Sequence, residues 1–399
     1  MVPVAFVFRD NLAALATTRE LGRAGIEVYV FDSTPGPAAE SRYSRFVQAP
    51  NYYEDPAGWA RFLRAQAARH VDAPVIFPTE DAALLVADRF HAELSPVLRY
   101  PYAAPGPAVA ALDKRSLYAS AEEIGAAVPR CIALDDASTP RMMDGESEWI
   151  AKPACRYWFD TSGRSIHTFL RLTGGSKAIE GDARAAARRI ADAGFPAILQ
   201  ERVPGPFENL FSVGLVVGRD GALLGSFCSR KHGEYPEPFG DGLIVETVEC
   251  DEDLVEQAVE LLRKLGYWGI CDIEFKLDER DGHYKLLDAN PRVWLWMGLG
   301  ALKGVPLALH AYALATGDRA VLARAPRERQ TEVSWVSPRG SAAFLLKAWR
   351  PARHGWGLAG RVGLGALRTV LRDLVLFRDP LYVKPGAWSS MARALGRPR

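Results

Sequence analysis

Residues 269–292 read GICDIEFKLDERDGHYKLLDANPR, and this stretch is the most informative part of a 399-residue chain. Its two apolar-rich runs, Ile270–Leu277 and Tyr284–Ala289, have the length and composition of strands. Asp281 and Gly282, between them, suit a tight turn. The stretch therefore predicts an antiparallel β-hairpin.

Acidic and amide side chains gather on one face of this predicted hairpin. Because strand side chains alternate, Glu274 shares a face with Asp272, and Asp288 shares a face with Asn290 on the returning strand. Two carboxylates and an amide oxygen suit a hard cation such as Mg²⁺, which nucleotide phosphates usually complete. Arg292 would place a fixed positive charge beside that metal. On spacing alone, a solvated face with incidental acids explains the pattern equally well.

The first hundred residues have a different pattern, which is typical of βαβ units and a parallel sheet. The expected elements are strands at Val4–Phe8, Ile26–Phe31 and Val75–Pro78 and a helix at Leu12–Ala24. Ligands of open parallel sheets bind at the carboxyl ends of strands, which brings Arg9–Asn11 and Thr79–Asp81 to a potential pocket. Ordinary cap and loop roles explain these residues equally well.

The middle of the chain reads as a linker followed by a second α/β region. The Pro-rich segment Tyr100–Pro107 is the predicted linker, and a helix begins at Asp113 and ends near Gly125. The remaining expected elements are strands at Trp149–Lys152 and Ala197–Glu201 and a hairpin of Phe211–Val217 with Ala222–Phe227.

Composition excludes several classes of protein. The chain has 49 Lys and Arg against 48 Asp and Glu, a balance that argues against nucleic-acid binding. Its five cysteines form no CxxC pair, so we expect a reduced, cytoplasmic protein without structural zinc. No stretch approaches the roughly 20 apolar residues of a membrane span, and Arg9 and Asp10 interrupt the N-terminal apolar run too early for a signal peptide.

LLDANPR after GICDIEFKLD resembles the magnesium-binding hairpin of the ATP-grasp superfamily of carboxylate ligases, and further matches lie upstream in the family's order. Asp113-Lys114 stands where the ATP-binding region of these ligases begins, and WIAKPA supplies Lys152, the strand lysine that contacts nucleotide phosphates. LQERVPGPFE resembles the hinge, where Glu201 to Val203 line the adenine slot through backbone groups and Glu208 takes the ribose hydroxyls. Four ordered motifs are far more specific than one, and the resemblance covers roughly residues 1–320.

One departure from the family pattern concerns the phosphate-binding loop. ATP-grasp enzymes commonly carry a compact glycine-rich loop soon after the strand lysine, but here the bulky segment PACRYWFDTSG follows Lys152. The better glycine cluster is Thr173–Lys177, whose backbone amides would cradle phosphates while Lys177 adds charge. The alternative is that this segment is only a loop before the helix near Arg184.

A second departure is Asp288, which stands where Glu is more usual and is one methylene shorter, so its reach to two metals is in question. The long loop and the segment SRKHGEYP, residues 229–236, look closest to the D-aspartate-ligase-like branch of the superfamily. In that segment Arg230 and Lys231 are candidates for holding an acyl phosphate or a substrate carboxylate, against the alternative of a solvated pair of cations. His232 is a candidate general base, but a structural role explains a single histidine more simply.

The C-terminal region is basic and rich in tryptophan. From residue 331 onward there are 12 basic and 3 acidic side chains and four tryptophans. Apolar residues recur at intervals near three and four over 358–377, which predicts an amphipathic helix. Within this basic extension, residues 339–399 would either contact an anionic membrane surface or pack on the body of the protein.

Together these observations predict an α/β chain with three parts. They are an N-terminal parallel-sheet, Rossmann-like domain (1–105), an ATP-grasp domain (106–330, with subdomains of about 113–200 and 201–330) and a basic helical extension (331–399).

The resemblance implies a ligase that uses ATP and Mg²⁺, or Mn²⁺, to activate a small-molecule carboxylate as an acyl phosphate for coupling to an amine. The predicted catalytic residues are Arg292 and Arg230, the metal ligands are Glu274, Asp288 and Asn290, and the ATP-binding residues are Lys114, Lys152, Lys177, Glu201, Val203 and Glu208. A thiol or carrier-bound acceptor, or a non-catalytic nucleotide-binding module, are the alternatives. A cytoplasmic location is expected, while the oligomeric state, with a homodimer as one option, and membrane contact through 339–399 stay open.

Overall fold

The structure is a computed structural model that describes residues 3–133, 148–159, 163–169, 177–235, 239–242, 244–325 and 333–337. The glycine cluster Thr173–Ser176 and the basic extension from residue 338 onward therefore lie outside the described residues. Within the described part no helix is long and apolar enough to cross a membrane.

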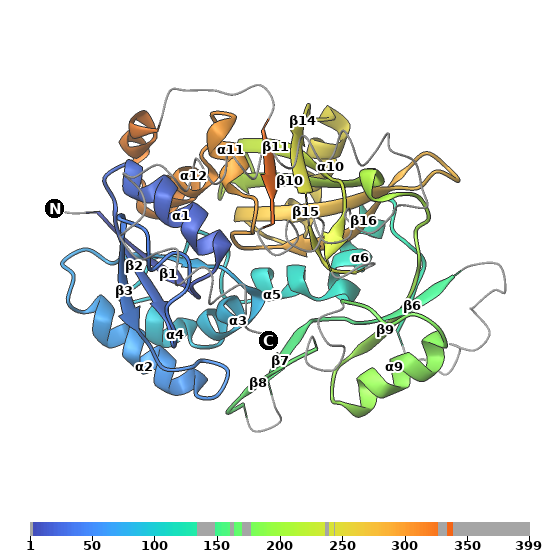
Figure 1. Ribbon diagram of the computed structural model, residues 1–399, viewed down its shortest axis with the longest axis horizontal. Helices are drawn as coiled ribbons and strands as arrows, with labels where there is room; N and C mark the ends of the chain where they lie inside the picture. The colour runs from blue at the N-terminus through green and yellow to red at the C-terminus, as the bar shows by residue number, and fades with distance from the viewer. Residues whose placement is uncertain are drawn as a thin grey trace, which may run out of the picture.

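The N-terminal region forms a parallel sheet with helices on its faces, as predicted, but the sheet has a fourth strand, Ser44–Gln48, that the sequence analysis did not include (Figure 1). The strand order is β3 (Ser44–Gln48), β2 (Glu27–Asp32), β1 (Val4–Phe8), β4 (Val75–Pro78). The helices are α1 (Leu12–Arg23), α2 (Pro56–Ala67), α3 (Asp81–Arg89) and the short α4 (His91–Leu94). Asn11 begins α1 by accepting a hydrogen bond from the Ala14 amide at 3.0 Å, which satisfies one of the free N–H groups of the first turn.

The first half of the predicted linker Tyr100–Pro107 is instead a buried connection, whereas Pro105 and Gly106 are exposed. Tyr102 is fully buried, and backbone hydrogen bonds join Ala103 to Trp268 and Pro101 to Ile270. Gly269, with φ +115°, permits this contact, because a Cβ there would lie 2.4 Å from the Tyr102 Cα. Buried backbone needs hydrogen-bond partners, and here the neighbouring sheet supplies them, which composition alone does not reveal.

The largest described sheet is antiparallel and contains the hairpin of residues 269–290. Its order is β16 (Tyr284–Asn290), β15 (Gly269–Leu277), β10 (Leu210–Val217), β11 (Leu223–Lys231), β14 (Ile244–Val248), β17 (Ser334–Val336). Strand β17 shows that the first residues of the predicted extension pair with this sheet. The boundaries at residues 105 and 330 otherwise stay a prediction.

The two faces of this sheet are covered differently. On one face Val213, Leu215 and Phe275 pack in the same core as apolar residues of α10 (Glu252–Lys264). On the other face Val216 and Ile270 pack in a core with α12 (Leu307–Thr316). Only one half of that second face is apolar; the half that carries Glu274 and Asp288 is polar. The remaining elements here are α11 (Gly298–Leu302) and the 3₁₀ turns Phe207–Asn209 and Arg319–Arg324.

A smaller α/β unit lies beside the large sheet in Figure 1. It contains the antiparallel sheet β5 (Cys131–Ala133), β9 (Ala197–Glu201), β6 (Trp149–Pro153), with α9 (Ala183–Asp192) packed on it. The hairpin β7 (Tyr157–Phe159) with β8 (Ile166–Thr168), the ribbon β12 (Glu234–Tyr235) with β13 (Asp241–Gly242), and helices α5 (Pro107–Leu112) and α6 (Lys114–Glu123) complete the described elements.

One covalent feature differs from expectation. Cys228, on β11, and Cys250, just after β14, form a disulfide across neighbouring strands. The absence of a CxxC pair and the odd number of cysteines predict reduced thiols, so this expectation is wrong for Cys228 and Cys250. The pairing depends on strand register, which brings residues 22 positions apart together.

Candidate active site

A cleft opens between the large sheet and the small α/β unit. Its polar lining includes three carboxylates, Glu234, Glu274 and Asp288, and six cations, Lys114, Lys152, Arg156, Lys177, Arg202 and Lys276. The apolar part of the lining includes Ile150, Val203, Phe207, Leu210, Phe239 and Leu287. The cleft therefore combines a strongly charged end with a slot suited to a flat, uncharged group.

The predicted hairpin acids do face one another. In the register of β15 and β16, Glu274 lies opposite Asp288 and Asp272 lies opposite Asn290. A bulge follows Glu274, so that Phe275 pairs with Leu286. Directly opposed residues on antiparallel strands share a face, and the alternation derived from the sequence is confirmed.

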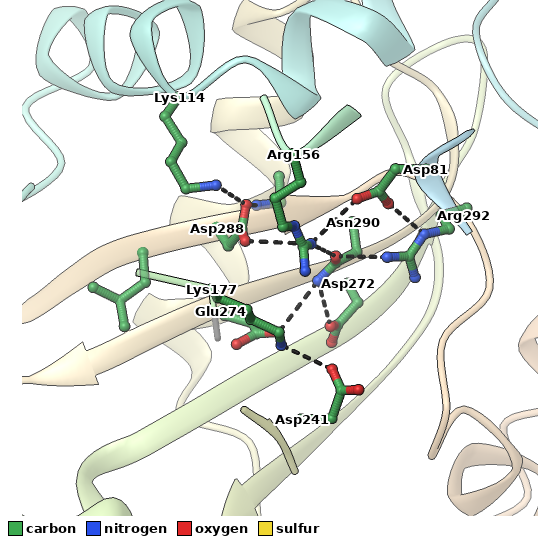
Figure 2. Close-up of polar contacts among 12 residues, drawn as sticks. Asp81, Lys114, Arg156, Lys177, Asp241, Asp272, Glu274, Asp288, Asn290 and Arg292 are labelled. Atoms are coloured by element: carbon green, nitrogen blue, oxygen red, sulfur yellow. Dashed lines mark hydrogen bonds and ion pairs between the residues drawn. The ribbon is translucent and has the colours of Figure 1, made fainter. Parts of the chain in front are cut away.

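Two cations hold Asp288. The Lys114 ammonium lies 2.9 Å from one carboxylate oxygen, and the Arg156 guanidinium lies 3.6 Å from the other (Figure 2). Burial by itself would raise the pKa of Asp288, but these charges outweigh it and hold the pKa well below its usual range. Asp288 is therefore an anion at any physiological pH.

Glu274 has its own buried cation, Lys231. The Lys231 ammonium donates to Glu274 at 2.6 Å and lies 3.5 Å from Glu234, and its side chain is only 2% exposed. Burial by itself would lower the pKa of Lys231, but the negative charge of Glu274 outweighs that effect, so the pKa of Lys231 lies above its ordinary value. Asp272 lies beside them and hydrogen-bonds to Ser212 and Asn290; burial, and then the Glu274 charge, raise its pKa to about 7.

Asn290 links the carboxylates to two arginines. Its amide nitrogen donates to Asp272 at 3.1 Å and to Glu274 at 3.3 Å. Its amide oxygen accepts from Arg292 at 3.1 Å and from Arg156 at 3.4 Å, as Figure 2 shows. In this orientation the amide oxygen faces the guanidinium groups, which differs from its predicted place as a metal ligand.

Arg292 is positioned by the N-terminal sheet. Its Nε donates to Asp81 at 2.6 Å, and the second oxygen of Asp81 lies 3.2 Å from Arg156. Asp81 begins α3 after β4, and through Arg156 it contacts a residue that lines the cleft, whereas residues 79–81 themselves are not among the lining residues. Burial opposes the charge of Asp81, but Arg292 and Arg156 keep its pKa below the usual value.

The predicted lysines on the small unit also reach the cleft. The Lys152 ammonium lies 6.0 Å from the centre of the Phe239 ring, and burial, followed by the charge of Lys114, lowers its pKa to about 8. Lys177 pairs with Asp241 at 2.9 Å. Together with Lys114, these side chains bring three ammonium groups to one end of the cleft.

The predicted hinge lies along the slot. Gln200, Arg202 and Val203 line it, and the Val203 carbonyl accepts from Lys276 at 2.9 Å. The Glu201 side chain instead forms ion pairs with Arg280 at 2.6 Å and Arg130 at 3.2 Å, so only its backbone is available to the slot. Glu208 lies in the turn that carries Phe207 but is not among the described residues that line the cleft.

The structure does not bring Arg230 to this cluster. On β11, Ser229 and Lys231 share the face of Glu274, whereas Arg230 pairs in register with Phe211 on the opposite face. Its guanidinium forms an ion pair with Glu246 at 2.7 Å, and His232 contacts the same carboxylate. A one-residue change of position along a strand exchanges faces, so the site cation of the predicted pair is Lys231.

Arg156 and the role of Asp81 are the features that sequence reasoning missed. Arg156 lies in the bulky segment after Lys152, whose composition assigns it no role. The one signal in the sequence is an arginine four residues after a predicted strand that ends at the site. Its significance depends on contacts with Asp81 and Asp288, which are distant in the sequence.

Comparison with known proteins agrees with the predicted resemblance. Residues 247–321, which include Glu274, Asp288, Asn290 and Arg292, match the family described as carbamoyl-phosphate synthase L chain, ATP binding domain. A D-aspartate ligase from Enterococcus faecium (strain Aus0004) is 23% identical over 283 residues, which are 68% of this chain and 66% of the ligase. The chain thus spans just under two thirds of the length of that relative.

Two solved structures share the fold. An L-amino acid ligase from Bacillus licheniformis matches with a TM-score of 0.53 and 14% identity, over 79% of this chain and 74% of that one. A biotin carboxylase from Campylobacter jejuni, in complex with β,γ-ATP, matches with a TM-score of 0.58 and 15% identity, over 79% and 71%. At this identity the likeness concerns the fold alone.

Proposed function

We propose that this chain, whose fold is that of the ATP-grasp superfamily, is an ATP-dependent ligase that joins a carboxylate to an amine and forms ADP and phosphate. The observation that carries the proposal is the opposition of Glu274 and Asp288 at the end of a cleft that Lys114, Lys152 and Lys177 also line. Carboxylates beside a group of ammonium ions suit a triphosphate bound together with a divalent cation.

Nucleotide binding would use both ends of the cleft. The purine would occupy the slot beside Val203, Phe207 and Leu210, and the phosphates would lie against the lysines. Backbone contacts at Glu201 to Val203, and a ribose contact from Glu208, stay proposals carried over from the family resemblance.

The residues also fit a divalent cation. Glu274 and Asp288 offer hard oxygen ligands. Within the described ranges no three or more His, Cys, Asp or Glu side chains are arranged to hold a metal ion, so the protein alone would not complete its coordination. An ion here would take its other ligands from phosphate oxygens and water, as Mg²⁺ commonly does. When bound with the nucleotide, Mg²⁺ or Mn²⁺ would neutralise charge that develops on the phosphates.

The remaining residues act on the substrates. A substrate carboxylate oxygen would attack the γ-phosphorus, releasing ADP and forming an acyl phosphate, and an amine would then displace inorganic phosphate and lose a proton. Arg292 is oriented by Asp81 and would stabilise the acyl phosphate and the anionic tetrahedral intermediate. The work of these residues is positioning and electrostatic stabilisation.

The similarity to a D-aspartate ligase and an L-amino acid ligase supports amino acids as the first substrates to test. The experiment measures ADP and phosphate release with a panel of amino acids and simple carboxylates, alone and in pairs, with Mg²⁺ or Mn²⁺. Hydroxylamine, which captures acyl phosphates as hydroxamates, identifies the activated carboxylate without knowledge of the acceptor. A thiol panel tests the alternative acceptor class.

Variants connect that activity to the site. Glu274→Gln and Asp288→Asn should lose hydroxamate formation, whereas Glu246→Gln, on the opposite face of the same sheet, should retain it. Nucleotide binding without phosphate release across the whole panel would instead favour a regulatory nucleotide-binding module. Equal hydroxamate formation by Glu274→Gln and the unmodified chain would contradict the assigned site.

A further inference from the structure

Three carboxylates line the cleft, and Glu234 is the one with the most distant protein partner. Asp288 lies 2.9 Å from the Lys114 ammonium, and Glu274 lies 2.6 Å from the Lys231 ammonium. Glu234 lies 3.5 Å from that same Lys231, and this is the closest contact of its carboxylate among the described residues. Its side chain is nevertheless only 11% exposed.

Strand pairing fixes the backbone around Glu234. It begins β12, which pairs with β13 so that Glu234 lies opposite Gly242. Just before it, the His232 amide donates to the Ile244 carbonyl at 2.9 Å, which continues the pairing of β11 with β14. The carboxylate is therefore held at the cleft by sheet structure, and not by a chance loop conformation.

Lysines surround Glu234 without forming a close pair with it. Its charge acts on Lys152 and Lys177, which also line the cleft. Burial raises the pKa of Glu234, and the charges of Lys231 and Lys177 offset this only in part. In the proposed function Lys152 and Lys177 contact nucleotide phosphates, which takes up their positive charge. A buried carboxylate is then left poorly compensated, which costs free energy unless another cation pairs with it.

We propose that Glu234 binds the ammonium group of the amine substrate and so selects a cationic acceptor. The inference rests on the proposed function, because it assigns a residue to the second substrate of the same cleft. The acyl phosphate forms where the γ-phosphate lies, against Lys152 and Lys177, and the acceptor has to reach its carbonyl carbon beside them.

The chemistry of the pair is simple. A hydrogen bond between an ammonium and a carboxylate is shorter and stronger than one between neutral groups. The ammonium loses a proton to water before the amine attacks, so Glu234 determines where the acceptor is held and takes no part in the chemical step.

Hydroxylamine is the discriminating probe, because it is a nucleophile that is largely uncharged at neutral pH. Glu234→Gln keeps the size of the side chain and removes its charge. For the amino acid that gives the most phosphate release in the substrate panel, this variant should raise the acceptor KM by about 10- to 100-fold, with little change in kcat. The rate of hydroxamate formation should stay unchanged. Glu246→Gln, a matched change on the opposite face of the large sheet, should alter neither quantity.

A measurement on the unmodified chain tests the same point without a variant. Ethylammonium chloride should slow hydroxamate formation, because it competes for Glu234. Ethanol, its uncharged counterpart, should not do so at the same concentration and ionic strength. Equal inhibition by the two compounds would overturn the assignment.

The outcomes separate this inference from the proposed function. An unchanged acceptor KM in Glu234→Gln, or a higher KM for the carboxylate substrate instead, would overturn the role of Glu234 and leave the ligase proposal intact. Loss of hydroxamate formation in a folded Glu234→Gln chain would overturn it as well, because the residue would then serve the nucleotide. Absence of ATP-dependent hydroxamate from the unmodified chain would overturn the proposed function itself. If Glu234→Gln does not fold, Glu234→Asp replaces it; the shorter side chain should raise the acceptor KM and leave hydroxamate formation unchanged.

Discussion

Arg230 and Lys231 are consecutive cations on β11, but they lie on opposite faces of the sheet and differ strongly in side-chain exposure. Arg230 is 37% exposed and pairs with Glu246, which is 33% exposed, on one face of the large sheet. Lys231 is 2% exposed and pairs with Glu274 on the face that forms the cleft. The same charge at adjacent positions is therefore a surface ion pair in one case and part of the candidate active site in the other. The comparison teaches that strand parity, more than residue type, assigns a charged residue to the site.

The largest expected effect concerns the stability of the buried pair. Lys231→Met leaves Glu274 and Glu234 without their shared cation in a buried place, and breaking such a pair costs about 3–5 kcal/mol. Urea unfolding of the nucleotide-free chain measures the loss. A change below about 1 kcal/mol would mean that water already compensates these carboxylates and that the contrast between the two faces is weaker than the structure indicates.

The second expected effect is catalytic. Glu274→Gln should lower ATP-dependent phosphate release by about 100-fold or more, the scale on which single electrostatic groups act in enzymes. Glu246→Gln, on the opposite face, should stay within about twofold of the unmodified chain. Steady-state phosphate release under saturating nucleotide measures both. Similar losses in the two variants would show that the faces are not functionally distinct.

A third effect extends the comparison to Lys152, on the small sheet. Its pKa, lowered to about 8, means that the free chain carries this charge below pH 8 and loses it above. Binding of an anionic nucleotide then requires uptake of a proton, so the dissociation constant should rise above pH 8 by up to about tenfold per pH unit. Calorimetric titration at pH 7, 8 and 9 measures this trend.

Lys152→Arg is the control for that trend, because a guanidinium stays charged throughout this range. Its nucleotide affinity should change much less between pH 7 and 9. The same slope in both proteins would assign the pH dependence to another group.

The smallest expected effect belongs to the exposed pair. Arg230→Met should change stability by no more than about 1 kcal/mol, as is typical of solvent-exposed ion pairs. The same urea experiment measures it beside Lys231→Met. A loss of unfolding free energy as large as that of Lys231→Met would show that Arg230 stabilises the fold as much as the buried cation does.

Much of the candidate site was predictable because it lies within one hairpin. The alternation of side chains along residues 269–292 placed Glu274, Asp288 and their neighbours on one face, and the register of β15 and β16 confirms it. Three strands of the N-terminal parallel sheet were predictable for the same reason, since each has its own local pattern of apolar residues, but β3 was not predicted. Arg230 was not, because the sequence does not show which face of β11 is turned to the cleft.

The amino-acid sequence by itself determined the local elements, the shared face of the hairpin acids and the presence of lysines on the strands that approach them. Only the tertiary structure decided that Asp81, at the start of α3, orients Arg292, that Arg156 forms an ion pair with Asp288, and that residues 100–103 are buried. The physical reason is that strand periodicity is set by neighbouring residues along the chain. Ion pairs and burial instead depend on how elements distant in the sequence pack together, and no local pattern records that.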